Sequence, residues 1–392
     1  MASAKARRDL AKGLHRYCQW KIDNEEDISS DELEDYLDDL ADIELREEPP
    51  GSSNVPNKFD LDNLSELKCV SYFGFHKRDL ARLRKALLIP DSVATKASDR
   101  VDGIEGLCIF LISLFSASSL QQQFDVFRRS EGSISRIRST VFDMIHTTWG
   151  HLIELDPHRL TPGYLQQCCD VLVDCGSPLP NLCGFVDCIF QPLAKCSGHD
   201  KARYNESLKM FGYRYQALVT PDGLIQALYG PYDGSRNELD IYFCSSLRTQ
   251  LQQLNMSPTS AQHCHPIVHG GEHYISDDAL ISPVSAATLG IHSLSAYHVS
   301  SDQHGALLET RAVLQWAFNK IDTLFPVAPS SGPRRFNRPV DVSAGRFMAV
   351  ATVIANCHTC LNGPPCAETQ FALTPIPSLD SYLVPNAPVT SS

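Results

Sequence analysis

The hydrophobic pattern of the chain changes its period near residue 181. Before this point, apolar residues recur every three or four positions, as on the buried face of a helix. After it, apolar and polar residues alternate in several segments, as along a half-buried strand. We therefore expect an all-α region followed by an α/β or α+β domain with a mixed sheet and flanking helices.

Residues 65–155 predict the helical region. Asp102, with Glu105 three positions later, resembles a capping box at the start of a helix. A second, shorter helix is expected over 120–127, and a third is expected to begin near Ser133 after a break. Two short helices across a Gly-containing turn have helix-turn-helix spacing, although an ordinary three-helix unit produces the same pattern.

Basic residues lie around this turn. Phosphate contact requires fixed positive charge, which arginine supplies. The sequence therefore favours DNA binding through four side chains, namely Arg128, Arg129, Arg136 and Arg138.

Residues 156–362 predict the sheet domain. The segments 183–193, 211–219 and 224–229 have strand periodicity, and Thr220-Pro221-Asp222-Gly223 has turn composition, so the last two strands form a hairpin. A short strand is expected at 273–276. Helices are expected at 239–254, 307–325 and 342–360.

Charge distinguishes the ends of the chain from its body. The net charge is -12, yet 23–48 alone carries fourteen acids and one Arg, which leaves the remainder near neutral. This composition predicts a disordered arm over 1–64 that is dispensable for folding, with a partner-binding role as the alternative. The Pro-rich tail, 363–392, is expected to be extended.

The cysteines and the apolar runs bear on the compartment. The fourteen Cys show no paired framework, which is typical of reduced intracellular thiols. The N-terminus lacks the apolar segment of a signal peptide. The longest apolar run, Leu107–Phe115, is too short to span a bilayer, so we expect no membrane association and no secretion.

Two acids on predicted strands are candidates for metal chemistry. Asp187 lies inside the first strand and Asp277 directly follows the fourth. Phosphoryl transfer by two metals requires converging carboxylates that hold the cations about 4 Å apart. Their oxygens suit Mg²⁺ or Mn²⁺. The spacing alone does not separate these acids from the other Asp and Glu of the chain.

A series of motifs over about 70–383 resembles the Harbinger-type transposase-derived nucleases of the DDE superfamily of endonucleases. The resemblance implies an RNase H-like fold, a helix-turn-helix that binds DNA and metal-dependent hydrolysis by Asp-Asp-Glu. It rests on these segments, in order: Val101-Asp102-Gly103-Ile104-Glu105, Gly150-His151-Leu152-Ile153, Gly184-Phe185-Val186-Asp187, Val219-Thr220-Pro221-Asp222-Gly223, Leu228-Tyr229-Gly230-Pro231, Trp316-Ala317-Phe318 and Asn356-Cys357-His358-Thr359-Cys360.

The chain departs from the family pattern at chemically important positions. Gln315 stands where the family has its final Glu, on a polar helix stripe that should point it toward the site. An amide offers one neutral oxygen, so metal binding should be weak. Glu206-Ser207-Leu208-Lys209 replaces a Gly-His-Lys-Arg run, and Asn237-Glu238 replaces His-Asp.

Three functions therefore remain open. The first is an impaired nuclear endonuclease relative in which Asp187, Asp277 and Gln315 form the catalytic site and the two Asp hold the metal. The second is a catalytically dead DNA-binding or scaffold protein, and the third is a decayed transposon copy. DNA is the expected partner in the first two, with a DNA-binding protein as a further partner.

Three other groups have simpler interpretations. His263, His265, His269 and His273 could bind Zn²⁺, but they lack the spacing of a known motif, so a polar loop is favoured. Cys357 and Cys360 form a lone CxxC and are expected to be buried thiols. The basic segment 333–339 could contact phosphate, although a solvated loop is favoured.

Overall fold

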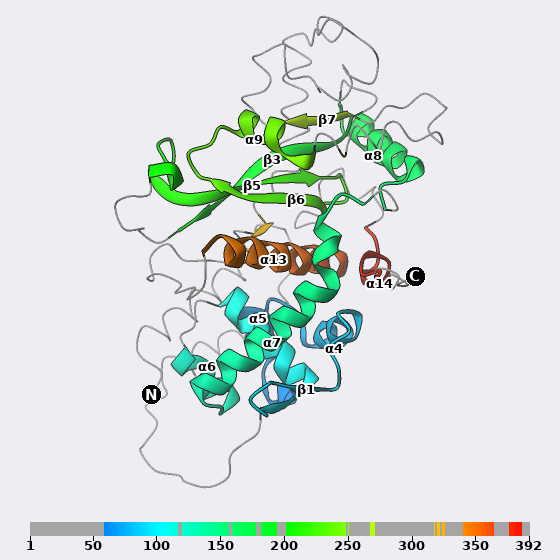
Figure 1. The fold of residues 1–392 in the computed structure, drawn as a ribbon. Coiled ribbons are helices and arrows are strands. Elements are labelled where there is room, and N and C mark those ends of the chain that lie inside the picture. Colours follow the sequence, from blue (N-terminus) through cyan, green and yellow to red (C-terminus); the bar gives the residue numbers. More distant parts are fainter. Residues whose placement is uncertain are drawn as a thin grey trace, which may run out of the picture. The chain divides into compact units, whose positions relative to one another are not determined.

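The computed structural model divides into two compact units, and each is described by itself (Figure 1). The first unit is Met1–Trp149 with Asp322–Ala328 and Leu383–Ser392, and the second is Gly150–Ile321 with Pro329–Tyr382. The predicted boundary lay at 155. The structure describes residues 59–116, 120–156, 159–177, 182–193, 201–247, 250, 267–270, 317, 320–321, 324–325, 340–363 and 376–385.

The first unit is mainly helical. Its elements are η1 (Leu61–Asn63), α3 (Glu66–Phe73), α4 (Lys77–Ala86), β1 (Ser92–Ala94), β2 (Arg100–Asp102), α5 (Gly103–Phe115), α6 (Leu120–Phe127) and α7 (Glu131–Trp149). The strands β1 and β2 form a small antiparallel hairpin that the sequence analysis did not predict. Three-residue strands are too short for alternation to reveal them.

Helix α5 is the centre of this unit. Eleven of its thirteen residues are buried, so it is apolar on all sides, as expected of a core helix. It starts as predicted, because the Asp102 carboxylate accepts a hydrogen bond from the N–H of Ile104. Glu105 has another role than the predicted capping box, because its carboxylate binds Arg129 instead.

Two boundaries in this region differ from the prediction, the start of the third helix by two residues and the end of the arm by more. Helix α7 begins at Glu131 because Ser130 caps it, with its Oγ accepting from the N–H of Ser133 at 3.3 Å. The predicted arm extends too far, because the Phe59 ring lies 4.9 Å from that of Phe127. A truncation at Leu64 would remove this contact. The chain before Phe59 lies outside the described residues.

The second unit contains a mixed sheet with helices. Its strands are β3 (Leu182–Pro192), β4 (Tyr204–Asn205), β5 (Met210–Val219), β6 (Ile225–Asp233) and β7 (Ile267–Gly270). Its helices are η2 (Gly150–Ile153), α8 (Pro162–Asp174), η3 (Lys201–Arg203), α9 (Glu238–Cys244), α13 (Val340–Asn362) and α14 (Leu379–Tyr382).

The sheet has β3 and β5 at its centre. Antiparallel β6 and β4 pair with β5, and β7 pairs with β3 in parallel. The hairpin predicted over 211–229 is present, but β6 continues through Pro231 to Asp233. Within the described sheet β6 pairs on one side only, where a proline without an N–H is tolerated.

The remaining predictions in this unit have mixed outcomes. The helix predicted at 342–360 is α13, which extends from Val340 to Asn362. The tail contains a helical turn, α14, where extended chain was expected, because the Tyr382 hydroxyl accepts a hydrogen bond from Asn356. The strand predicted at 273–276 lies outside the described residues. None of the helices described is both long and apolar enough to cross a membrane.

Candidate functional site

Asp187 lies in the middle of the central strand β3. Its backbone is opposite Ala217 of β5, and its carboxylate accepts a hydrogen bond from the N–H of Cys188 at 2.7 Å. The side chain is half-buried. On the other side of β3, Val186 is the register partner of Gly270, the last residue of β7. Asp187 is therefore the first residue of β3 beyond the part of that strand that pairs with β7.

The Asp187 side chain faces away from α8 and α9. Its neighbour Val186 packs in an apolar cluster with Cys168 of α8 and Tyr242 of α9. Because successive side chains of a strand point to opposite faces, Asp187 lies on the other face of the sheet. Helix α13 lies on that face, where Asn356 bonds to Ile225 of β6 (Figure 1).

Lys320, five residues after Gln315, contacts α13. Lys320 is buried, and its ammonium donates a hydrogen bond to Thr359 of that helix at 2.7 Å. Desolvation by burial lowers the pKa of Lys320 to about 7. Gln315 itself, like Asp277, lies outside the described residues, so convergence of the three predicted site residues stays a prediction. The described residues include no cluster of three His, Cys, Asp or Glu able to hold a metal.

Two of the four predicted DNA-binding arginines form ion pairs within the helical unit. Arg129 grips the buried Glu105 with Nε and Nη2, at 2.6 and 3.1 Å, and hydrogen bonding to this carboxylate raises the pKa of Arg129. Arg136 binds Asp99 in the same way, at 2.7 and 3.0 Å. The hydrogen bond from Arg136 is the main cause of the lowered pKa of Asp99.

The other two arginines differ in exposure. Arg128 is exposed and has a φ of 52°, directly after α6. Arg138 is half-buried on α7, and desolvation lowers its pKa. Of the four arginines, Arg128 is therefore the one that is exposed and takes part in neither of these two ion pairs.

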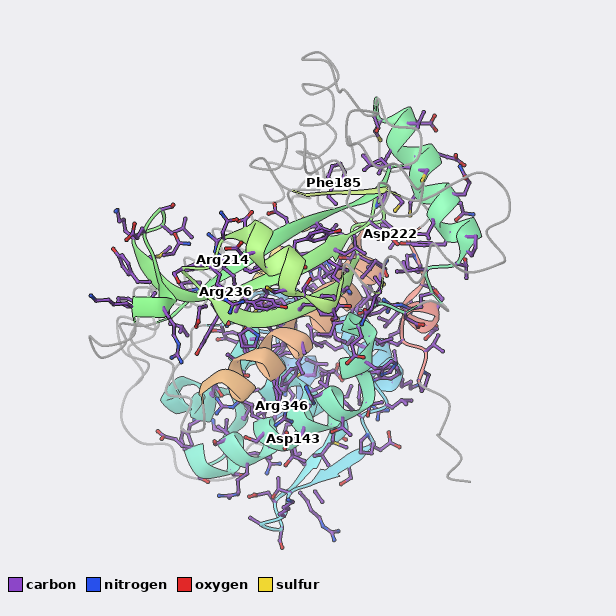
Figure 2. The ribbon with its side chains drawn as sticks, turned by 45° about the horizontal axis from the view of Figure 1, so that its top comes forward. Asp143, Phe185, Arg214, Asp222, Arg236 and Arg346 are labelled. Carbon is purple, nitrogen blue, oxygen red and sulfur yellow. The ribbon has the colours of Figure 1, made fainter. Side chains whose placement is uncertain are left out.

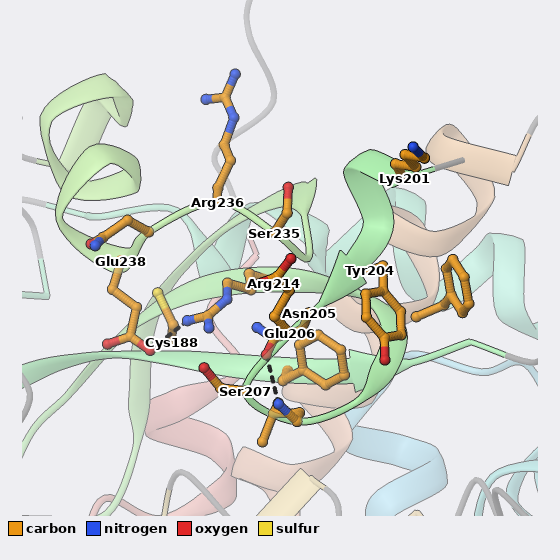
Figure 3. A pocket seen from close by; sticks show the side chains of 14 residues that line it. Cys188, Lys201, Tyr204, Asn205, Glu206, Ser207, Arg214, Ser235, Arg236 and Glu238 are labelled. Carbon is orange, nitrogen blue, oxygen red and sulfur yellow. Dashed lines mark hydrogen bonds and ion pairs between the residues drawn. The ribbon is translucent and has the colours of Figure 1, made fainter. Parts of the chain in front are cut away.

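A hollow of about 1110 Å³ opens on the α9 face of the sheet, away from Asp187 (Figure 3). It lies beside the strands β3, β4 and β5 and the segment that precedes α9. The lining residues are Cys188, Phe190, Lys201, Tyr204, Asn205, Glu206, Ser207, Leu208, Phe211, Arg214, Ser235, Arg236, Asn237 and Glu238. Both departures from the family pattern outside the acidic site, at 206–208 and at 237–238, fall in this list.

The opposite end of the sheet holds a buried polar network instead. Asp222 accepts hydrogen bonds from Tyr164, Thr220 and the N–H of Leu224, and its carboxylate pKa is raised because burial desolvates it. Figure 2 shows Asp222 at this end and Arg214 and Arg236 toward the other. The segment 220–223 is thus the predicted turn, held by its own side chains.

Two further candidates have structural roles or remain undescribed. Cys357 is buried on α13 and burial raises its thiol pKa, as expected, whereas Cys360, also expected to be buried, is half-buried. His269 belongs to β7 rather than to a polar loop. The other three histidines of that group and the basic segment 333–339 lie outside the described residues.

Sequence reasoning missed β7 and the hollow. The adjacent β-branched residues Ile267 and Val268 were the available signal for the strand, but four residues give little periodicity. The hollow joins residues separated by up to fifty positions, which the pairing of β3, β4 and β5 and the segments beside these strands bring together. Comparison of the chain with protein-family models, curated proteins and solved structures gives no match.

Proposed function

We propose that the chain is a Harbinger-type, transposase-derived relative of the DDE superfamily of endonucleases, which binds DNA in the nucleus and is impaired in metal-dependent phosphodiester cleavage. The observation that carries this proposal is the position of Asp187. It lies in the central strand β3, directly after the last residue paired with the parallel strand β7.

The strand order supports an RNase H-like fold. Strand β3 pairs antiparallel with β5, and β5 pairs antiparallel with β6. The later strand β7 pairs in parallel with β3, on the side of β3 that faces away from β5. The strand β7 ends at Gly270, opposite Val186, so the chain leaves this strand beside Asp187. Asp277 follows seven residues later in the sequence.

The carboxylates of Asp187 and Asp277 would supply the metal ligands. Hard divalent cations prefer such oxygens, and Mg²⁺ or Mn²⁺ bound there would activate the attacking water and stabilise the leaving oxygen. Gln315 replaces the third carboxylate with a neutral amide. At an effective dielectric near 20, one lost charge about 4 Å from the metal removes about 4 kcal/mol per unit of cation charge.

DNA binding is assigned to the helical unit. The three residues between α6 and α7 form a short turn, as a helix-turn-helix requires. The ion pairs of Arg129 and Arg136 brace this region, because each ties it to a carboxylate more than twenty residues away. Arg128 is the exposed arginine suited to a phosphate contact.

A catalytically dead DNA-binding protein is the second candidate. It is favoured by Gln315, and by Leu208 and Asn237, which stand where the family has basic or acid–base side chains. Both replacements line one hollow, so the chemistry of a whole surface differs from that of the family pattern. DNA binding is common to both candidates, and cleavage separates them.

Nicking of supercoiled plasmid DNA with Mg²⁺ or Mn²⁺ tests the proposal. We expect weak or no nicking by the unmodified chain and partial recovery in Gln315→Glu, because 1.4 kcal/mol already changes a rate about tenfold. The variant Gln315→Glu with Asp187→Ala is the control and should be inactive. Leu208 and Asn237 would keep the single variant below the rate of an intact enzyme.

The outcomes separate the candidates. Strong metal-dependent nicking by the unmodified chain, abolished by Asp187→Ala, would contradict the impaired site. Duplex binding without nicking in either the unmodified chain or Gln315→Glu would favour the dead DNA-binding protein. Absence of both binding and nicking would remove DNA processing as the function.

A further inference from the structure

The hollow on the α9 face has an aromatic wall. Tyr204 of β4 and Phe211 of β5 lie on paired strands, with ring centroids 4.9 Å apart and ring planes at 57°. Phe190 of β3 adds a third ring beside them. It fits there because residue 212 is glycine, where a Cβ would lie 2.4 Å from this ring. All three rings are half-buried, so each has a partly exposed surface.

Internal hydrogen bonds preform the hollow. The side chain of Asn205 is buried, its Nδ2 donates to the carbonyl of Gly234 at 2.9 Å, and its Oδ1 accepts from the N–H of Leu208 at 2.8 Å. Gly234 itself allows a close approach, because a Cβ there would lie 2.5 Å from the carbonyl oxygen of Gly212. The aromatic wall and the turn over 206–209 therefore keep their positions without a ligand.

The charges of the lining leave two available cations. Arg214 is neutralised by its ion pair with Glu238. Lys201 and Arg236 are exposed and form no ion pair with any residue that the structure describes. They come from the segments on either side of the aromatic wall, before β4 and after β6. Glu206 is the remaining acid of the lining.

Apolar exposure marks the same place. Leu208, which lines the hollow, is 45% exposed, and Met210, two residues later, is 37% exposed. Aromatic rings, exposed apolar side chains and cations together suit a ligand that has flat apolar groups and spaced negative charges. Single-stranded nucleic acid has both, because unpaired bases stack on aromatic rings while its phosphates contact basic side chains.

We propose that this hollow binds an unpaired segment of a DNA strand, with a base stacked on Tyr204 and with Lys201 and Arg236 contacting phosphates. The volume of about 1110 Å³ is close to the upper end of the range of about 300–1,000 Å³ common for small-molecule pockets, so volume alone does not separate a strand from one free nucleotide. The helix beside it, α9, has two acids in its first turn, which disfavours a triphosphate group there.

Single-stranded DNA in this hollow would be one form of the substrate of the proposed DNA-processing function, and the inference rests on that function. Cleavage chemistry is assigned to the α13 face of the sheet, where Asp187 lies, whereas the hollow is on the α9 face. Binding of a displaced strand there would hold the DNA open, and it requires no metal ion. Strand binding is therefore measurable in the presence of a chelator, independently of nuclease activity.

Fluorescence anisotropy of the full chain with a labelled twelve-residue oligothymidylate, in EDTA, is the first test. Base–aromatic stacking is worth about 1–3 kcal/mol per base, so Tyr204→Leu should weaken binding by about tenfold or more. Tyr204→Phe keeps the ring and should bind as the unmodified chain does. This pair separates stacking from folding, because leucine preserves an apolar side chain at the position.

The salt dependence of binding tests the cations. Each phosphate contact to a single strand contributes about 0.7 to the slope of log K against log salt, so the double variant Lys201→Gln, Arg236→Gln should reduce the slope by about 1.4. Lys209→Gln is the matched control. Lys209 is exposed in the adjoining turn but is not part of the lining. The variant Lys209→Gln should therefore change the slope of log K against log salt less than Lys201→Gln alone does.

Several results would overturn the proposal. These are absence of oligothymidylate binding at 100 mM salt, equal affinity of Tyr204→Leu and Tyr204→Phe, and equal slopes for Lys209→Gln and Lys201→Gln. Competition by thymidine monophosphate at the oligonucleotide concentration would assign the hollow to free nucleotides instead. Nicking by Gln315→Glu without strand binding would refute this proposal alone, and strand binding without nicking by Gln315→Glu would refute cleavage alone.

Discussion

The two units differ in the bonds that their partly or fully buried polar side chains form. In the helical unit, charged side chains pair with one another around an apolar core helix. Glu105 binds Arg129 and Asp99 binds Arg136, and each pair joins positions far apart in the chain. These four charges are paired within the unit, and α5 contributes a core of almost purely apolar side chains.

In the sheet unit, neutral polar side chains enter the core itself. Asn356 of α13 bonds both to the N–H and to the carbonyl of Ile225 and donates to the Tyr382 hydroxyl. Gln226 donates to Tyr164 and Thr220 in a connected network. These bonds join a strand edge to helices that come much earlier and much later in the sequence.

The contrast explains where ligands can bind. Bidentate ion pairs orient the arginines of the helical unit toward its own carboxylates, so Arg129 and Arg136 stabilise shape more than they attract phosphate. The sheet unit satisfies its polar groups at the Asp222 end of β5. The other end retains an open hollow with exposed cations, Lys201 and Arg236.

Breaking the polar core of the sheet unit should have the largest effect. Asn356→Leu removes three hydrogen bonds and leaves the backbone groups of Ile225 buried without partners, which should lower the free energy of unfolding by about 3–5 kcal/mol. Urea unfolding measures the change. Asn362→Leu, an exposed asparagine of the same helix, is the control and should change it by less than about 0.5 kcal/mol.

The comparison would fail if the two asparagine variants unfolded at the same urea concentration. That result would mean that α13 and its network contribute little to the stability of the sheet unit. A selective loss in Asn356→Leu would instead establish the network as the link between β6 and the C-terminal helices.

The ion pairs of the helical unit should differ from each other. Glu105→Leu leaves Arg129 partly buried without its carboxylate, and breaking a buried pair costs about 3 kcal/mol or more. Arg136→Gln breaks an exposed pair, and surface pairs contribute little, so its melting temperature should stay close to that of the unmodified chain. Thermal unfolding followed by circular dichroism checks both variants. Equal losses would show that burial does not decide the strength of these pairs.

Much of the fold could be predicted because local pattern decides it. Alternation identified β3, β5 and most of β6, and the Asp102 cap identified the start of α5. Helix α7 begins at Glu131, two residues before the predicted start, because the Ser130 hydroxyl accepts a hydrogen bond from the N–H of Ser133. Local chemistry therefore predicts element type well and element ends less well.

The site was less predictable because it depends on contacts between distant residues. The ion pairs of Arg129 and Arg136 were not predicted, because their carboxylate partners lie 24 and 37 positions away. The hollow depends on the register that pairs β3, β4 and β5. Whether Gln315 reaches Asp187 depends on residues outside the described part of the chain, and it stays a prediction.

Lys320 provides the smallest and most specific test of the polar core. Burial lowers its pKa to about 7, below the value of about 10.4 in an unfolded chain. Between these two values the unfolded state binds a proton that the folded state does not, so stability falls as the pH falls toward 7 and levels below it. Raising the pH from 7.5 to 8.5 should therefore add about 1 kcal/mol to the contribution of Lys320.

The measurement is the difference in unfolding free energy between the unmodified chain and Lys320→Met, taken at both pH values. Buried thiols such as Cys357 also titrate in their unfolded form and oppose the trend, but they are common to both proteins and cancel in the difference. Lys85→Gln, at an exposed position, should leave the difference unchanged with pH. A pH-independent difference for Lys320→Met would mean that Lys320 is charged in the folded chain, and that the layer beside α13 admits water rather than excluding it.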